Sequence, residues 1–123
     1  MLNYKAYFID LDGTVYRGKT PIPDAVKFIH YLQSNGNQPF FVTNNSSMTQ
    51  QQLQEKLAIM DIQVDTEHII SSSIAAANYI NEFMPGKEVF MIGELGLEDA
   101  LKSRDISITT GMADVVVLGI DRH

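Results

Sequence analysis

The chain has 123 residues, of which 45% are hydrophobic and 20% are charged, values typical of a folded globular protein rather than a disordered or fibrous one. Its formal net charge is -6 and no cluster of Lys or Arg occurs, so nucleic-acid binding is not expected. Cysteine is absent, which excludes disulfides and thiolate sites and favours a cytoplasmic location. No signal peptide is expected, and no apolar run reaches the ~20 residues that a membrane span needs.

The first predicted strand covers residues 4–9, a short apolar and aromatic run that ends at Asp10-Leu11-Asp12-Gly13-Thr14. A helix follows, with Asp24 as its N-cap and Gly36 as its stop, because apolar residues recur at helical spacing. These residues are Ala25, Phe28, Ile29 and Leu32. Residues 39–42 form a second predicted strand, which ends in the polar run Thr43-Asn44-Asn45-Ser46-Ser47.

The middle of the chain repeats this alternation. Thr49 and Gln52 have the spacing of a capping box, and a predicted helix follows from them through Leu53, Leu57 and Met60. A short strand at residues 69–70 leads into Ser71-Ser72-Ser73 and another predicted helix, which Pro85-Gly86 ends. The apolar face of that helix comprises Ile74, Ala77, Ile80 and Phe83.

Beyond Pro85-Gly86 the pattern predicts a strand at 89–92, a helix at 97–101, a short strand at 106–108 and a strongly β-branched strand at 115–120. Strands that alternate with helices favour right-handed crossovers and a parallel sheet. The predicted fold class is therefore α/β, with a Rossmann-like parallel sheet and helices on both faces. In such sheets ligands bind beyond the carboxyl ends of the strands, which is where both polar runs are expected.

Asp10 and Asp12 are two positions apart at a strand end, so their carboxylates tend toward the same side and repel each other. Mg²⁺ would relieve this repulsion, because it prefers oxygen ligands and is typically held by one or two carboxylates with a substrate phosphate. Asp10 could then attack phosphorus as a nucleophile, while Asp12 protonates the leaving oxygen and later activates water. Thr43 and Asn44 offer donors to the phosphoryl oxygens.

Each of the two motifs also has a simpler reading. An Asp-x-Asp-Gly sequence by itself is more often a turn with a local side-chain hydrogen bond, and Asn and Ser are common in ordinary loops and helix caps. Their occurrence together, at the ends of successive predicted strands, favours a functional site.

These motifs resemble those of the haloacid dehalogenase superfamily. Asp10-Leu11-Asp12-Gly13-Thr14 is similar to its first motif, D-x-D-x-T, and Thr43-Asn44 to its second. The runs 12–18 and 43–47 resemble the branch that contains N-acetylglucosamine-phosphate phosphatase and 4-nitrophenyl-phosphatase-like enzymes. The resemblance implies that Asp10 is the nucleophile, Asp12 is the acid/base, and Thr43, Asn44 and Asn45 bind phosphate. It further implies that the Asp10 carboxylate and the Asp12 carbonyl bind Mg²⁺.

The resemblance extends along the whole chain but does not include the family's third and fourth motifs, a lysine and an acidic pair. The run 115–121 imitates the fourth motif and is interpreted as a strand of the inserted cap. Lys56, Lys87 and Lys102 are interpreted as solvated surface residues rather than substitutes for the lysine. We therefore expect a fragment of a longer protein, with 1–84 from the catalytic core, 85–123 from the start of the cap, and the C-terminal half of both absent.

The leading hypothesis is hydrolysis of small phosphomonoesters, with a small-molecule phosphate ester as the partner and neither nucleic acid nor membrane. A phosphotransferase or mutase could use the same two aspartates. A non-catalytic, receiver-like phosphate-binding module is the alternative from another class, although a receiver's phosphoacceptor normally ends a later strand. The natural substrate and the oligomeric state are not readable from the sequence. His30, His68 and His123 lack the spacing of a zinc site, and Arg17 is interpreted as an exposed loop residue.

Overall fold

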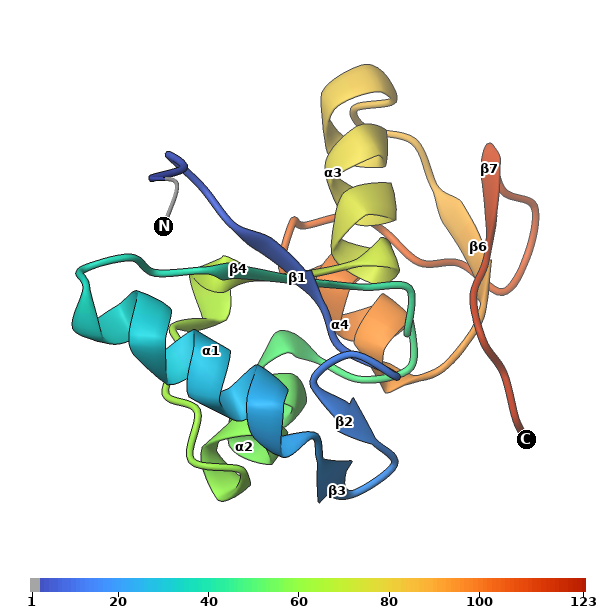
Figure 1. Ribbon diagram of the computed structural model, residues 1–123. Coiled ribbons are helices and arrows are strands. Elements are labelled where there is room, and N and C mark those ends of the chain that lie inside the picture. The colour runs from blue at the N-terminus through green and yellow to red at the C-terminus, as the bar shows by residue number, and fades with distance from the viewer. Residues whose placement is uncertain (1–2) are drawn as a thin grey trace. The chain divides into compact units, whose positions relative to one another are not determined.

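The computed structural model describes residues 3–123, which fold into two compact units (Figure 1). Unit 1 takes in the described residues up to Thr43 together with Gln51–Ile70, and unit 2 contains Asn44–Gln50 and Ser71–His123. The elements in chain order are β1 (Phe8–Asp10), β2 (Tyr16–Arg17), β3 (Thr20–Pro21), α1 (Pro23–Ser34), β4 (Phe40–Thr43), α2 (Gln50–Ile59), the 3-10 helix η1 (Thr66–His68), β5 (Ile69–Ser71), α3 (Ser72–Phe83), β6 (Val89–Ile92), α4 (Leu95–Lys102) and β7 (Val115–Leu118).

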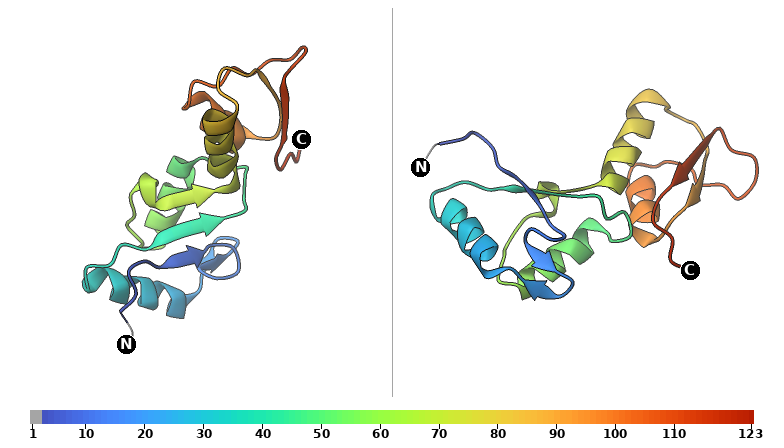
Figure 2. Two further views of the ribbon diagram at one scale, coloured as in Figure 1. Left: turned by 90° about the horizontal axis from the view of Figure 1, so that it is seen from above. Right: turned by 45° about the vertical axis from the view of Figure 1, so that its right-hand side comes forward.

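Unit 1 is built on a three-stranded sheet in the order β1-β4-β5. Strands β1 and β4 are parallel, with Phe8 opposite Phe40 and Asp10 opposite Val42. The connection from β1 to β4 contains α1, and the connection from β4 to β5 contains α2. Both connections move in the same direction across the sheet, so right-handed crossovers place the two helices on the same face, as Figures 1 and 2 show. The predicted α/β class with a Rossmann-like parallel sheet is confirmed, and in unit 1 the described helices cover one face of that sheet.

The core of unit 1 lies between the sheet and the two helices. Large side chains from every layer are completely or almost completely buried there: Leu11, Val15, Tyr16, Ile29, Leu32, Phe41, Leu53, Leu57, Ile62 and Ile69. On the opposite face of the sheet the aromatic rings remain more accessible. Phe40 stacks on Phe8 at 5.3 Å and on the imidazole of His68 at 4.4 Å, and Phe8 is 66% exposed. The burial of apolar area therefore anchors β1 and β4 from the helical side.

Unit 2 pairs β6 and β7 in parallel, with Val89 opposite Val115 and Ile92 opposite Leu118. Residues of α3, β6 and α4 form its core: Ile74, Ala77, Ile80, Val89, Leu97, Ala100 and Leu101. The end of the described chain is tied to the start of α4, because the guanidinium of Arg122 donates two hydrogen bonds to the Glu94 carboxylate, at 2.9 and 2.6 Å. These bonds lower the pKa of Glu94 to about 2.

Gly96 allows α4 to approach residues 44–50 within unit 2. Its amide donates to the carbonyl of Ser47 at 2.9 Å, and a Cβ at position 96 would overlap the carbonyl oxygens of Met48 and Ser46. Backbone atoms cannot rotate away as a side chain can. Gly96→Ala is therefore expected to reduce the free energy of unfolding by about 1–3 kcal/mol, measured by thermal or urea unfolding.

A matched control exists for this substitution. A methyl group added at Gly111 would meet only the Thr109 hydroxyl at 3.8 Å, so Gly111→Ala is expected to unfold like the unaltered chain. Equal stability of the two alanine variants would contradict the close approach at Gly96.

Several predicted boundaries differ from the structure. The first strand begins at Phe8 rather than at residue 4, and the last ends at Leu118 rather than at residue 120. Residues 106–108 are not a strand, because Ile108 makes only an isolated bridge to Val89. The N-cap of α1 is Ile22, with Pro23 in the first turn, and Asp24 lies inside the helix.

Two further features depart from the predicted pattern. Phe28 and Phe83 are 42% and 62% exposed, so the buried faces of α1 and α3 are narrower than the apolar spacing indicates. The hairpin of β2 and β3 was not predicted.

The predicted boundary at Pro85-Gly86 falls inside unit 2, and the assignment of 1–84 to a catalytic core and 85–123 to a cap stays a prediction.

Candidate active site

Asp10, Asp12 and Thr43 lie at the same edge of the unit 1 sheet. Asp10 is the last residue of β1 and pairs in register with Val42, so Thr43 lies one residue further along the neighbouring strand. The carboxyl ends of parallel strands share one edge of the sheet, and this is the edge where α/β proteins bind ligands. The structure thus brings together three residues that the sequence predicts for one site.

The loop after β1 is a tight turn built around the carbonyl of Leu11. This carbonyl accepts hydrogen bonds from the amides of Thr14 and Val15, at 3.1 and 2.9 Å. The amide of Gly13, whose φ of +83° suits glycine, donates to the carbonyl of Tyr16 at 2.7 Å. The side chain of Leu11 is completely buried in the core of unit 1, and this burial anchors the loop.

Both carboxylates of this loop belong to exposed residues. The hydroxyl of Thr14 lies 3.4 Å from Oδ2 of Asp10, at the long limit of a hydrogen bond. Within residues 3–123 neither Asp10 nor Asp12 forms an ion pair with a basic side chain. The two carboxylates are therefore open to a ligand and are not held by a structural arginine.

The pair fits a hard cation that keeps part of its water shell. No group of three or more His, Cys, Asp or Glu side chains in the described part of the chain could enclose a metal ion. Mg²⁺ does not require such a group, because one or two carboxylates with waters and a substrate phosphate commonly suffice. The Asp10 carboxylate is a ligand of that kind, and the Asp12 backbone carbonyl offers a second oxygen beside it.

Tyr16 is a residue of this region that the sequence does not single out. It is completely buried, and its hydroxyl is the only buried side-chain polar atom among the described residues that lacks a hydrogen-bond partner. Burial, then the charge of Asp12, and then that of Asp10 raise its pKa to about 12. An aromatic residue after an apolar one normally indicates core packing, so no sequence signal distinguishes this hydroxyl.

Lys56 covers the ring of Tyr16. Its Nζ lies 3.8 Å from the ring centroid, which is a cation-π contact, and the residue is partly buried in α2. Lys56 is therefore only partly exposed and contacts a ring, which departs from its interpretation as a solvated surface residue, whereas Lys87 and Lys102 are exposed as predicted.

The other two predicted phosphate ligands, Asn44 and Asn45, belong to unit 2. Asn44 is exposed, and its carbonyl accepts a hydrogen bond from the hydroxyl of Ser72 at 3.1 Å. The carboxamide oxygen of Asn45 accepts from the amide and the hydroxyl of Ser47, at 2.9 and 2.6 Å. This is the local turn bond typical of Asn in loops, and a phosphate-binding role for either residue stays a prediction.

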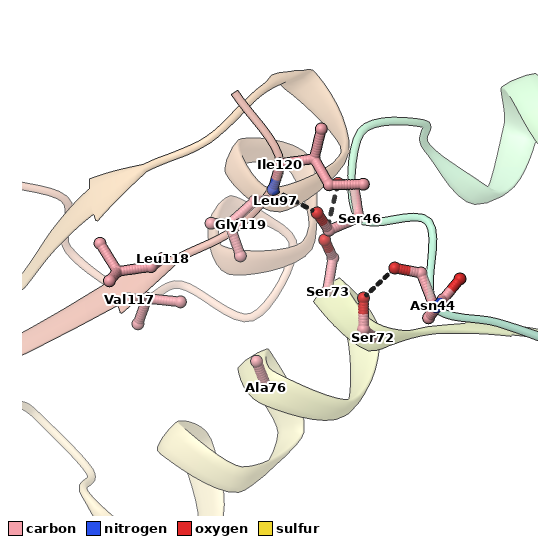
Figure 3. Close-up of a pocket in the computed structure, with 10 residues that line it drawn as sticks. All are labelled: Asn44, Ser46, Ser72, Ser73, Ala76, Leu97, Val117, Leu118, Gly119 and Ile120. Carbon is pink, nitrogen blue, oxygen red and sulfur yellow. Dashed lines mark hydrogen bonds between the residues drawn. The ribbon is translucent and has the colours of Figure 1, made fainter. Parts of the chain in front are cut away.

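Unit 2 contains a cavity of about 270 Å³ next to Asn44 (Figure 3). Ser46 links its walls, because its hydroxyl accepts from the amide of Ile120 and its carbonyl from the hydroxyl of Ser73, both at 2.8 Å. The lining combines polar residues from 44–46 and the start of α3 with apolar residues of α4 and β7: Asn44, Ser46, Ser72, Ser73, Ala76, Leu97, Val117, Leu118, Gly119 and Ile120.

The remaining candidates take no part in the carboxylate site. Arg17 is exposed on β2, which agrees with its interpretation as a surface residue. Asp121 accepts a hydrogen bond from the amide of His123 at 3.1 Å, as a turn residue does. None of the helices in residues 3–123 combines the length and the apolar character needed to cross a membrane.

Comparison with known proteins supports the resemblance over the whole chain. The acid sugar phosphatase of Staphylococcus aureus is 44% identical over 124 residues. Among solved structures, a thermostable NPPase from Geobacillus stearothermophilus is 42% identical with a TM-score of 0.91, and the match covers 100% of this chain and 48% of that one. The p-nitrophenyl phosphatase from Archaeoglobus fulgidus is 32% identical with a TM-score of 0.90, covering 98% and 47%.

The chain spans about half the length of the curated relatives it matches, since the alignment covers 100% of this chain and 48% of the acid sugar phosphatase. The family model for haloacid dehalogenase-like hydrolases matches residues 7–107, which include the Asp10 loop and the end of β4. The chain therefore belongs to the family of haloacid dehalogenase-like hydrolases.

Proposed function

We propose that the chain is the N-terminal part of a Mg-dependent phosphatase that hydrolyses small phosphomonoesters through an aspartyl-phosphate intermediate. The observation that carries this proposal is the position of two exposed carboxylates, which form no ion pair within residues 3–123, and of Thr43 at the carboxyl edge of one parallel sheet. The names of the relatives, acid sugar phosphatase and p-nitrophenyl phosphatase, support the same reaction class.

Asp10 is the nucleophile in this proposal. One of its carboxylate oxygens attacks phosphorus in line, the bond between phosphorus and the leaving oxygen breaks, and Asp12 gives its proton to that oxygen. Water then attacks phosphorus of the acyl phosphate and passes a proton to Asp12. The bond between phosphorus and the Asp10 oxygen breaks, so that phosphate is released and the Asp10 carboxylate is restored. The Asp10 carboxylate and the Asp12 carbonyl would hold Mg²⁺, which supplies positive charge against the phosphoryl oxygens.

Thr43 would bind the transferred phosphoryl group in this scheme. The residue is 3% exposed, so a hydrogen bond that it makes to a phosphoryl oxygen is shielded from water and gains strength. Asn44 and Asn45 are the further proposed phosphate ligands, supplied by the loop that follows Thr43. The remaining positive charge and acidic ligands would come from chain beyond these residues, with 1–84 as core and 85–123 as the start of a cap. A cytoplasmic location stays a prediction from the lack of cysteine.

Two proteins made side by side test the proposed function: the 123-residue chain and a longer polypeptide that carries this chain as its N-terminal part. We expect the longer protein to release phosphate from 4-nitrophenyl phosphate and from sugar phosphates with Mg²⁺, and to lose this activity with EDTA. The 123-residue chain should show little or no turnover, because it does not include the lysine and the acidic pair of the family's third and fourth motifs.

The outcomes separate the parts of the proposal. Robust turnover by the pure 123-residue chain would contradict its status as a fragment. Transfer of the phosphoryl group to an added alcohol or sugar without release of phosphate would replace hydrolysis by phosphotransfer. Phosphate binding without turnover by the longer protein would favour a non-catalytic module.

A further inference from the structure

The two strands of unit 2, β6 and β7, are packed on one face only. Successive side chains of a strand point to opposite faces, and those of the inner face pack with the core that α3 and α4 form: Val89, Met91, Val115 and Val117. Figure 2 shows both helices on the same side of the two strands. The alternate side chains make up the outer face: Phe90, Ile92, Val116 and Leu118.

The outer face of β6 and β7 is apolar and open to solvent. Val116 is 63% exposed and Leu118 is 70% exposed. Ile92 is 44% exposed, and Phe90 is partly exposed beside it. In register, Phe90 lies opposite Val116 and Ile92 lies opposite Leu118, so the outer face is one continuous surface. Parallel strands with apolar residues on both faces are normally covered by helices on both faces, and residues 3–123 cover only the inner one.

Residues 107–109 define the order of the strands in unit 2. Val89 of β6 donates its amide hydrogen to the carbonyl of Ser107 at 2.9 Å, and its carbonyl accepts from the amide of Thr109 at 2.8 Å. Val89 also pairs in register with Val115 of β7. The segment 107–109 and β7 therefore lie along opposite edges of β6. The connection from β6 to this segment contains α4, which packs on the inner face.

The handedness of connections indicates which face the chain after β7 crosses. A further parallel strand beyond β7 reverses the direction of travel across the sheet relative to the connection through α4. Because such connections are right-handed, this one crosses the outer face, whereas α4 crosses the inner face. The inner face is already filled by α3 and α4, whose Ala77 and Leu101 are completely buried. The outer face is thus the one left for a connection that follows β7.

We propose that the outer face of β6 and β7 is the docking surface for an amphipathic helix formed by the segment that directly follows His123 in the longer protein. The inference depends on one part of the proposed function, that this chain is the N-terminal part of a longer protein, and not on the chemistry of Asp10. The match covers 48% of the acid sugar phosphatase, so a protein of that length has ample chain for such a helix. A strand rises about 3.3 Å per residue and a helix about 1.5 Å, so roughly nine helical residues match the length of β7.

Thermal unfolding of two threonine variants tests the docking surface in both proteins. Val116→Thr alters the outer face, and Val117→Thr alters the inner face at the next position. Threonine favours strands as valine does, so Val116→Thr should leave the melting temperature of the 123-residue chain unchanged. Val117→Thr places a hydroxyl against the core and should lower the melting temperature of that chain. In the longer protein both variants should lower it, by about 2–4 °C each.

Two results of this comparison would overturn the inference. If Val116→Thr leaves the melting temperature of the longer protein unchanged while Val117→Thr lowers it, the outer face is uncovered there as well. If Val116→Thr already lowers the melting temperature of the 123-residue chain, the chain covers this face by itself and needs no following helix.

Photo-crosslinking identifies what covers the outer face. A leucine analogue with a diazirine group, placed at position 118 of the longer protein, has nearly the size of Leu118 and reacts on illumination with what it contacts. We expect mass spectrometry to locate the crosslink within about 20 residues after His123, the length of a short loop and a helix. A crosslink to a more distant segment, or to a second copy of the protein, would contradict the proposed helix.

Phosphate release by the same samples separates this inference from the proposed function. If the longer protein hydrolyses 4-nitrophenyl phosphate but the crosslink is absent or distant, the proposed function stands and the docking surface is overturned. If the crosslink lies directly after His123 while the longer protein releases no phosphate, the docking surface stands and the proposed hydrolysis is contradicted.

Discussion

Replacing Asp10 with Asn is expected to lower phosphate release by the longer protein by more than about a thousandfold. The carboxamide has nearly the same size as the carboxylate, so packing should be preserved, but it is a far weaker nucleophile and carries no charge for the cation. Asp10 is exposed at the end of β1 and forms no ion pair within residues 3–123, so the fold does not depend on its charge. Steady-state release of phosphate measures the loss.

Asp61→Asn is the matched control for this change. It makes the same chemical substitution in unit 1, at a side chain that is 89% exposed and at a φ of +63° that Asn adopts readily. We expect it to keep full activity. Substantial turnover in Asp10→Asn, at a melting temperature equal to that of the unaltered protein, would remove Asp10 from the nucleophile's role.

Replacing Asp12 with Asn is expected to lower turnover by about 10²–10⁴-fold, with a loss that depends on the leaving group. An alkyl or sugar oxygen needs a proton to depart, so both steps should slow. Nitrophenolate departs without one, so the first step with 4-nitrophenyl phosphate should remain comparatively fast while hydrolysis of the aspartyl phosphate slows. Rapid-quench measurements should then show a burst of nitrophenolate close to one equivalent per site.

The comparison between the two substrates decides the role of Asp12. Equal losses for both, without a burst, would mean that Asp12 does not transfer protons and serves only the cation. The backbone carbonyl of residue 12 is the proposed metal ligand, so a side-chain variant should leave cation affinity nearly intact. Measuring how the rate of the slow step depends on Mg²⁺ concentration, in the variant and in the unaltered protein, checks that cation affinity is retained.

The position of Asp10 and Thr43 at one edge of the sheet was predictable, because it follows from two rules that use only short stretches of sequence. An apolar run that stops at Asp10 and another that stops at Thr43 define strand ends, and parallel pairing places such ends together. The structure confirms the pairing, with Asp10 opposite Val42. Helices α1, α2, α3 and α4 were predictable for the same reason, since each carries apolar residues at helical spacing.

Features that depend on tertiary contacts were not predictable. The β2–β3 hairpin has two residues in each strand and a turn at Gly18 with φ +60°, too short for a periodic signal. The contact of Lys56 with Tyr16 requires α2 to lie against this hairpin, so an amphipathic pattern alone assigns Lys56 to solvent. The unpartnered hydroxyl of Tyr16 is likewise visible only in three dimensions.

Chemical trapping of the intermediate tests the central claim most directly. The longer protein would be mixed with Mg²⁺ and substrate, quenched and treated with borohydride, which reduces an aspartyl phosphate to homoserine. We expect mass spectrometry to find homoserine at position 10, with position 12 and all other acids unchanged. Reduction at another residue, or none in a protein that turns over rapidly and accumulates a phosphorylated form, would contradict nucleophilic attack by Asp10.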